Sequence, residues 1–114
     1  MQFQFNSDSS VMGTKNVAER IEQQVRERLA RFESKLTRLE VHVRDENGDK
    51  GGGDDKACTI EARPAGGRPI GVTERAGDVD AAARKAAATL AQRLERHLAK
   101  GHRHDRDARP DKVL

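Results

Sequence analysis

Aromatic residues are scarce in this chain. Phe3, Phe5 and Phe32 are the only ones among its 114 residues, and Trp and Tyr are missing altogether. A surface that stacks successive bases needs more rings than this, so the composition excludes a base-stacking platform. Hydrophobic residues make up 34% of the chain and charged residues 36%. This balance, at this length, indicates a single domain with a modest core.

Cysteine is nearly absent as well. Cys58 is the only one, so no intramolecular disulfide can form, which fits a reducing cytosol. Because Cys58 would point inward on a strand and has no His near it in the sequence, we interpret it as a buried structural thiol. The first residues, "MQFQFN", lack the pattern of a signal peptide, and no apolar run approaches about 20 residues. We therefore expect a cytoplasmic protein without a membrane partner.

Catalytic and metal-binding motifs are also missing. The sequence has no GxSxG, no phosphate-binding loop and no HExxH, so nothing supports an enzyme, and no cofactor is expected. His97, His102 and His104, with Asp105, stand on both sides of an expected helix end, which gives no fixed ligand geometry. We expect neither catalytic residues nor a metal site.

Hydrophobic periodicity is present and predicts the secondary structure. Polar and apolar residues alternate over 2–6, 39–45, 57–64 and 68–75, as in half-buried strands. From Lys15 to Leu36 apolar residues recur every three or four positions, which predicts a helix of about five turns after the N-cap Thr14. A second helix is predicted to begin after the N-cap Asp78 and to end near Gly101.

The order β-α-β-β-β-α predicts an α+β fold. A right-handed crossover makes the first two strands parallel and the others follow as hairpins, so we expect a four-stranded mixed sheet. Each strand has one apolar face, which places both helices on the same side of the sheet. We expect one domain over residues 1–100 and a disordered polar tail over 101–114.

An acidic, glycine-rich segment, "DENGDKGGGDDK" (45–56), separates two of the strands. Asp45, Asn47 and Asp49 match the first ligand positions of a calcium loop, but Lys50 and Lys56 stand where Gly and Glu are required. Neither flank is long enough for a core of its own, which argues against a domain linker. We interpret the segment as a hairpin connection and expect it to project away from any basic surface.

Charge is unevenly distributed along the chain. Residues 15–38 hold seven basic and four acidic residues, and residues 78–100 hold five and three, whereas residues 39–56 hold three and six. The two helices are thus basic within a chain of net charge +3. Two interpretations remain open from this pattern: solvated helix faces, or a surface that binds phosphates.

The helix "RIEQQVRERLARFESKLTRLEVHV" and the helix "GDVDAAARKAAATLAQRLERH" carry a resemblance. Together with the order of elements, they resemble short ribosome hibernation-promoting factors and ribosome-associated inhibitor A over residues 1–100. The resemblance implies a non-enzymatic, monomeric factor that binds small-subunit rRNA and not DNA. It also implies that both helices bind in the decoding channel, where the protein blocks translation. The rRNA-binding candidates are basic helix residues: Arg28, Lys35, Arg84, Lys85, Arg93, Arg96, His97 and Lys100.

The chain departs from the family pattern in its second helix. Asp80 stands where an aromatic residue is common, and Thr89 stands where a lysine is common. These departures and the acidic segment motivate an alternative: a regulatory protein-interaction module that keeps the fold without binding the ribosome.

Overall fold

Four strands form one sheet in the computed structural model of the protein, and the strand order is β1-β2-β3-β4. The structure describes the backbone of residues 1–7, 15–46 and 55–108, and the side chains of 1–7, 17–46 and 55–98. Its elements are β1 (Gln2–Ser7), α1 (Lys15–Arg28), the 3-10 helix η1 (Ala30–Lys35), β2 (Leu36–Asp45), β3 (Lys56–Pro64), β4 (Ile70–Ala76) and α2 (Val79–Ala108).

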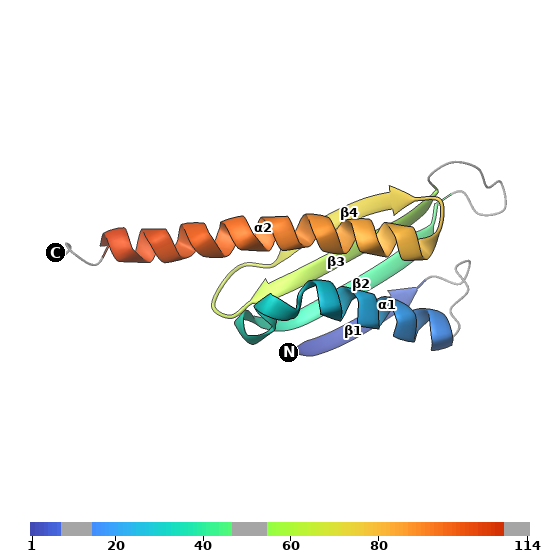
Figure 1. Cartoon of the computed structure of the whole chain (residues 1–114), viewed down its shortest axis with the longest axis horizontal. Helices are drawn as coiled ribbons and strands as arrows, with labels where there is room; N and C mark the ends of the chain where they lie inside the picture. Colours follow the sequence, from blue (N-terminus) through green and yellow to red (C-terminus); the bar gives the residue numbers. More distant parts are fainter. Residues whose placement is uncertain (8–14, 47–54, 109–114) are drawn as a thin grey trace.

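The sheet has the predicted mixed topology. Strands β1 and β2 are parallel, with Phe3 opposite Leu39, and the pairs β2–β3 and β3–β4 are antiparallel. Both α-helices cover the same face of the sheet, and the other face is open (Figure 1). The predicted α+β fold, with two helices on one side of a four-stranded sheet, is therefore confirmed.

The first helix is shorter than the sequence predicted. Helix α1 ends at Arg28, the next turn is the 3-10 helix η1, and Leu36 already belongs to β2. Phe32 N–H donates to the Leu29 carbonyl at 2.9 Å, a bond that closes a three-residue turn. An apolar spacing of three residues suits an α-helix and a 3-10 helix alike, so periodicity alone could not locate the change.

The second helix begins as predicted but ends later. Asp78 Oδ1 accepts a hydrogen bond of 2.7 Å from the Ala81 N–H, which confirms the N-cap. The predicted end at Gly101 is wrong, because α2 continues to Ala108. A glycine inside a helix costs only about 1 kcal/mol, whereas Pro110 strongly disfavours a helical residue before it. Residues 101–108 are thus helical, 109–114 lie outside the described residues, and the domain boundary at residue 100 stays a prediction.

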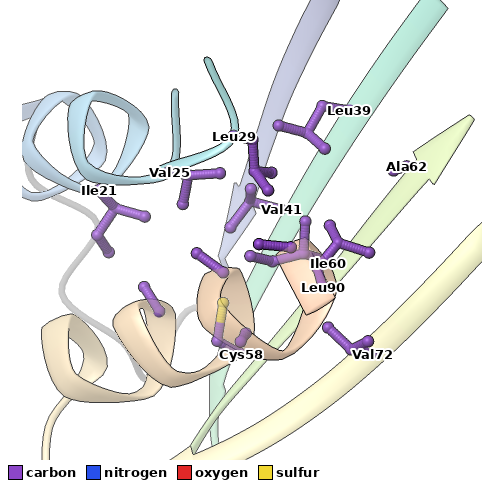
Figure 2. Close-up of a cluster of buried hydrophobic side chains, with 14 of the residues drawn as sticks. Ile21, Val25, Leu29, Leu39, Val41, Cys58, Ile60, Ala62, Val72 and Leu90 are labelled. Atoms are coloured by element: carbon purple, nitrogen blue, oxygen red, sulfur yellow. The ribbon is translucent and has the colours of Figure 1, made fainter. Parts of the chain in front are cut away.

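The core is one apolar layer between the sheet and the helices (Figure 2). Ile21 and Val25 of α1 lie there with Leu39, Ile60 and Leu90, all completely buried. The residues that α2 turns toward the sheet are mostly small, namely Ala82, Ala83, Ala86, Ala87 and Ala91. Because these side chains are small, the backbone of α2 can approach the sheet, and α2 packs closely on β3 and β4.

Cys58 is part of this core, as predicted. Its side chain is completely buried, and burial raises the pKa of the thiol to about 12, although Arg44 opposes the shift. A thiol with such a pKa is protonated at neutral pH and is a poor nucleophile.

The acidic segment connects a hairpin, as predicted. The β2–β3 ladder continues to the pair Asp45 and Lys56, and the Glu46 N–H donates to the Asp55 carbonyl at 2.8 Å. Lys56 Nζ lies 3.0 Å from Asp55 Oδ1 and 3.5 Å from Asp45 Oδ2, and its hydrogen bond to Asp55 raises the pKa of Lys56. Residues 47–54, and with them the direction in which the loop projects, lie outside the described residues.

Candidate nucleic-acid interface

Two ion pairs bind α2 to the helical segments before it, one to α1 and one to η1. Arg20 binds both carboxylate oxygens of Asp80, at 3.0 and 2.9 Å, and this hydrogen bonding raises the pKa of Arg20. Beyond the end of α1, Arg31 of η1 reaches Glu95 of α2 at 3.3 Å. The layer formed by α1, η1 and α2, called the helical layer below, is therefore held together near both ends. The two arginines that do this already bind an acid of the protein.

Ion pairs also hold three arginines of the open sheet face. Arg38 binds Glu40 at 2.8 Å and also donates to Gln2 and Gln4. Arg75 and Arg44 both bind Glu46, and the hydrogen bond from Arg75, at 2.7 Å, lowers the pKa of Glu46. The charges of these three arginines are therefore balanced by acids of the protein itself.

The predicted rRNA-binding cations differ from these. No ion pair within the described part of the chain involves the following residues: Arg28, Lys35, Arg84, Lys85, Arg93 and Arg96. All of them are exposed. Exposed cations without an ion pair can bind phosphates without first breaking a contact with an acid, so these residues are candidates for an interface.

The structure distributes these residues over three places. Arg28 and Arg84 border a hollow of about 360 Å³ between the two helices, together with Gln24, Glu27 and Ala87. The hollow places one cation from each helix on the same opening, as a shared phosphate site requires.

Lys85 and Arg93 lie on the other flank of α2, above the edge strand β4. Lys85 Nζ donates to the Arg75 carbonyl at 2.9 Å, and Arg93 Nη1 donates to the Gly71 carbonyl at 3.4 Å. Both acceptors are neutral, so both cations keep their net charge. Their spare N–H groups can still donate to another group.

Lys35 and His97 mark the end of the sheet where β3 turns into β4. The Lys35 carbonyl accepts a hydrogen bond from the Ala65 N–H at 3.0 Å. His97 lies over the same turn: its Nε2 atom would be 3.9 Å from a Cβ atom if Gly67 carried a side chain. Arg96 is exposed on α2 beside His97, and the side chain of Lys100 lies outside the described residues.

Both departures from the family pattern have structural partners. Asp80 is bound by Arg20, as described above, and Thr89 Oγ1 donates to Glu74 Oε2 at 2.8 Å. Neither residue therefore adds an unpaired negative charge to the helical layer.

Two further cations were missed by the sequence-based prediction. Arg63, at the end of β3, and Arg68, in the β3–β4 connection, are exposed and also lack an ion pair within the described residues. Arg63 stands between the buried residues Ala62 and Pro64, so its side chain lies on the open face of the sheet. The position of both arginines near η1 depends on the turn, which sequence periodicity does not locate.

Other kinds of site find no support among the residues described. No group of three or more His, Cys, Asp or Glu side chains there could hold a metal ion. None of the described helices is both long enough and apolar enough to span a bilayer.

Fold and side chains define a small α+β domain with a cationic helical layer. Residues 12–102 match the family described as Sigma 54 modulation protein / S30EA ribosomal protein. The chain belongs to this family, which confirms the resemblance to hibernation-promoting factors. No curated protein sequence matches the chain.

Solved structures share the fold. The Thermus thermophilus Protein Y N-terminal domain is 18% identical, with a TM-score of 0.68, and the match covers 85% of this chain and 99% of that one. A ribosomal subunit interface protein from Coxiella burnetii is 12% identical, with a TM-score of 0.67, over 87% of this chain and 99% of that one. At such identities the likeness is one of fold.

Proposed function

We propose that this protein is a non-enzymatic, ribosome-associated hibernation factor that binds small-subunit rRNA through its helical layer. The observation that carries the proposal concerns the helix cations whose side chains the structure describes: those predicted to bind rRNA lack ion pairs, whereas Arg20, Arg26 and Arg31 have them. Family membership and the likeness to a structure called a ribosomal subunit interface protein support a ribosomal partner.

The mechanism that we propose is steric. The helical layer lies along the RNA of the decoding channel and occupies the space that mRNA and the tRNA anticodon ends need. A-form RNA is recognised mainly by its shape, its phosphates and its 2′-hydroxyls, and such recognition needs no aromatic side chains. The chain, with only three Phe residues, fits this mode of binding.

The hollow between the helices suits a partner that carries phosphates. Arg28 and Arg84 border it, one from each helix, and both offer N–H donors. The protein would act as a monomer in the cytoplasm, without a membrane partner.

The alternative, a protein-interaction module that no longer binds ribosomes, is the weaker proposal. It was motivated by Asp80 and Thr89, and both residues have partners inside the fold. A pull-down from stationary-phase extract separates the two: rRNA with ribosomal proteins supports the hibernation factor, and a single protein partner supports the alternative.

Co-sedimentation with purified small subunits at low and moderate salt tests the proposal directly. We expect the unmodified protein to sediment with the subunits. Changing Arg28, Lys35, Arg93 and Arg96 together to Glu should abolish this, because four attractive contacts become repulsive. Circular dichroism must show that the variant is folded. Undiminished binding by the folded variant would show that the helical layer is not the interface.

A further inference from the structure

The connection between β3 and β4 is held by hydrogen bonds to β2 and η1. Thr37 Oγ1 donates to the Arg63 carbonyl at 3.1 Å, and the Ala65 N–H donates to the Lys35 carbonyl at 3.0 Å. The Gly67 N–H donates to the Pro64 carbonyl at 3.2 Å, and Gly66 has φ 73°. A type II turn requires such a positive φ at its third residue. The turn is therefore preorganised.

The charge at this end of the molecule is positive. Arg63 at the end of β3 and Arg68 in the β3–β4 connection lie at the same end of the molecule as Lys35 of η1 and Arg96 of α2, and none of the four has an ion pair within the described residues. The acids at this end are Glu33 and Glu61, because Glu95 is already bound by Arg31. The cations outnumber the acids that are left to oppose them.

At the opposite end of the sheet, the described strand cations are bound by acids. Lys56 lies between Asp45 and Asp55, and Glu46 binds Arg44 and Arg75. Figure 1 shows η1 and the β3–β4 connection at one end of the strands, whereas β2 ends and α2 begins at the other. Among the described residues of the sheet and its connections, the cations without ion pairs therefore lie at the end of the β3–β4 turn.

We propose that the end of the sheet at the β3–β4 turn is a third RNA-contacting element, in which Arg63 of β3 and Arg68 of the connection bind phosphates of the RNA backbone. This inference rests on the proposed function and extends its interface from the helices around the end of the sheet. Because the backbone here is fixed by hydrogen bonds, binding orders the two arginine side chains and costs little backbone entropy. The contact is to phosphates, so it positions the protein without reading base sequence.

A site-directed cleavage probe tests where the turn lies in the complex. Cys58 is buried and protonated at neutral pH, so a cysteine introduced on the surface can be labelled selectively with an iron chelate that cleaves nearby RNA. The probe is placed at Ala65→Cys on the turn, and the control at Thr73→Cys on the open face of β4. We expect rRNA cleavage from position 65 and little or none from position 73.

A matched pair of variants tests the two arginines. Arg63→Gln with Arg68→Gln removes two charges without internal partners, and Arg44→Gln with Arg75→Gln removes two charges that are held by Glu46. Each lost phosphate contact reduces the slope of log affinity against log salt by roughly 0.7–0.9. We expect the slope of log affinity against log salt to become less steep by about 1.4–1.8 in the first variant and to change very little in the second.

The outcomes separate this inference from the proposed function. If the unmodified protein does not bind small subunits, the proposed function fails and this inference fails with it. If the protein binds, but position 65 gives no cleavage and the Arg63/Arg68 variant keeps the full salt slope, only the role of the turn is refuted. Equal losses in both variants would also refute it, because net charge alone would then explain the effect.

Discussion

Salt dependence is the most direct quantitative consequence of an interface made of unpaired cations. If Arg28, Lys35, Arg84, Lys85, Arg93 and Arg96 each hold one phosphate, six contacts on the helices release counterions on binding. At roughly 0.7–0.9 per contact, these six alone should give log affinity for small subunits a slope of about −4 to −5 against log salt, before any contribution from Arg63 and Arg68. A rise from about 50 to 200 mM salt should then weaken binding on the order of 10³-fold.

Two triple variants show which cations are responsible. Arg28→Gln, Lys35→Gln and Arg96→Gln together remove three cations without ion pairs. The matched control, Arg26→Gln, Arg31→Gln and Arg38→Gln, removes three cations that bind Glu22, Glu95 and Glu40. Both lower the net charge equally. The first should make the slope less steep by about 2–3, and the control should change it little.

Fluorescence anisotropy or filtration with labelled protein, at four or five salt concentrations, measures the slope. Thermal unfolding of each variant verifies the fold, since Arg26 and Arg31 also lie over the rings of Phe3 and Phe32 at 5.0 and 4.6 Å. A slope shallower than about −2 for the unmodified protein would mean that few phosphates are bound. An equal change in both variants would mean that ion pairing in the free protein does not decide which cations bind, and our reasoning would be refuted.

Three further predictions concern the core, the thiol and the acidic loop. Leu90→Ala should lower the free energy of unfolding, measured by urea titration, by about 3–5 kcal/mol, because the alanines around Leu90 cannot fill the cavity. The control Gln92→Ala, on the exposed side of α2, should change it by less than about 0.5 kcal/mol. Cys58 should react with Ellman's reagent at pH 8 about 1000-fold more slowly in the folded than in the urea-unfolded protein, since its pKa rises from 9.0 to about 12. A ratio of the two reaction rates below about tenfold would contradict the burial of Cys58. Between pH 9 and pH 12 the thiol of the unfolded chain is ionised while that of the folded chain keeps its proton, so the free energy of unfolding should decrease as the pH rises above about 9. Replacing residues 47–54 by Asn-Gly should leave ribosome binding unchanged, because the ends of the loop, Glu46 and Asp55, lie at the end of the sheet opposite the β3–β4 turn; a large loss in co-sedimentation would show that the loop takes part.

Most of the fold could be predicted from local patterns. Alternation over residues 2–6, 39–45 and 57–64 located three strands within a few residues, because each strand has one buried and one open face. The change at Arg28 from α-helix to 3-10 helix could not be predicted from local patterns. It depends on the pairing of Leu36 with Pro64, because this pairing places Leu36 in β2 and so ends the helical segment. The helix end at Ala108 was missed because Gly101 is a weak stop signal.

The candidate interface divides in the same way. The sequence by itself determined the fold class, the buried thiol, the family resemblance and which helix residues are basic, because each depends on composition or on spacing along the chain. Only the tertiary structure decided which cations remain available. Arg20 and Arg31 are neutralised by acids about sixty positions away, while Arg63 and Arg68 belong to the interface that we propose because a turn fixed to η1 places them there. Ion pairing depends on distance in space, and spacing along the sequence does not determine that distance.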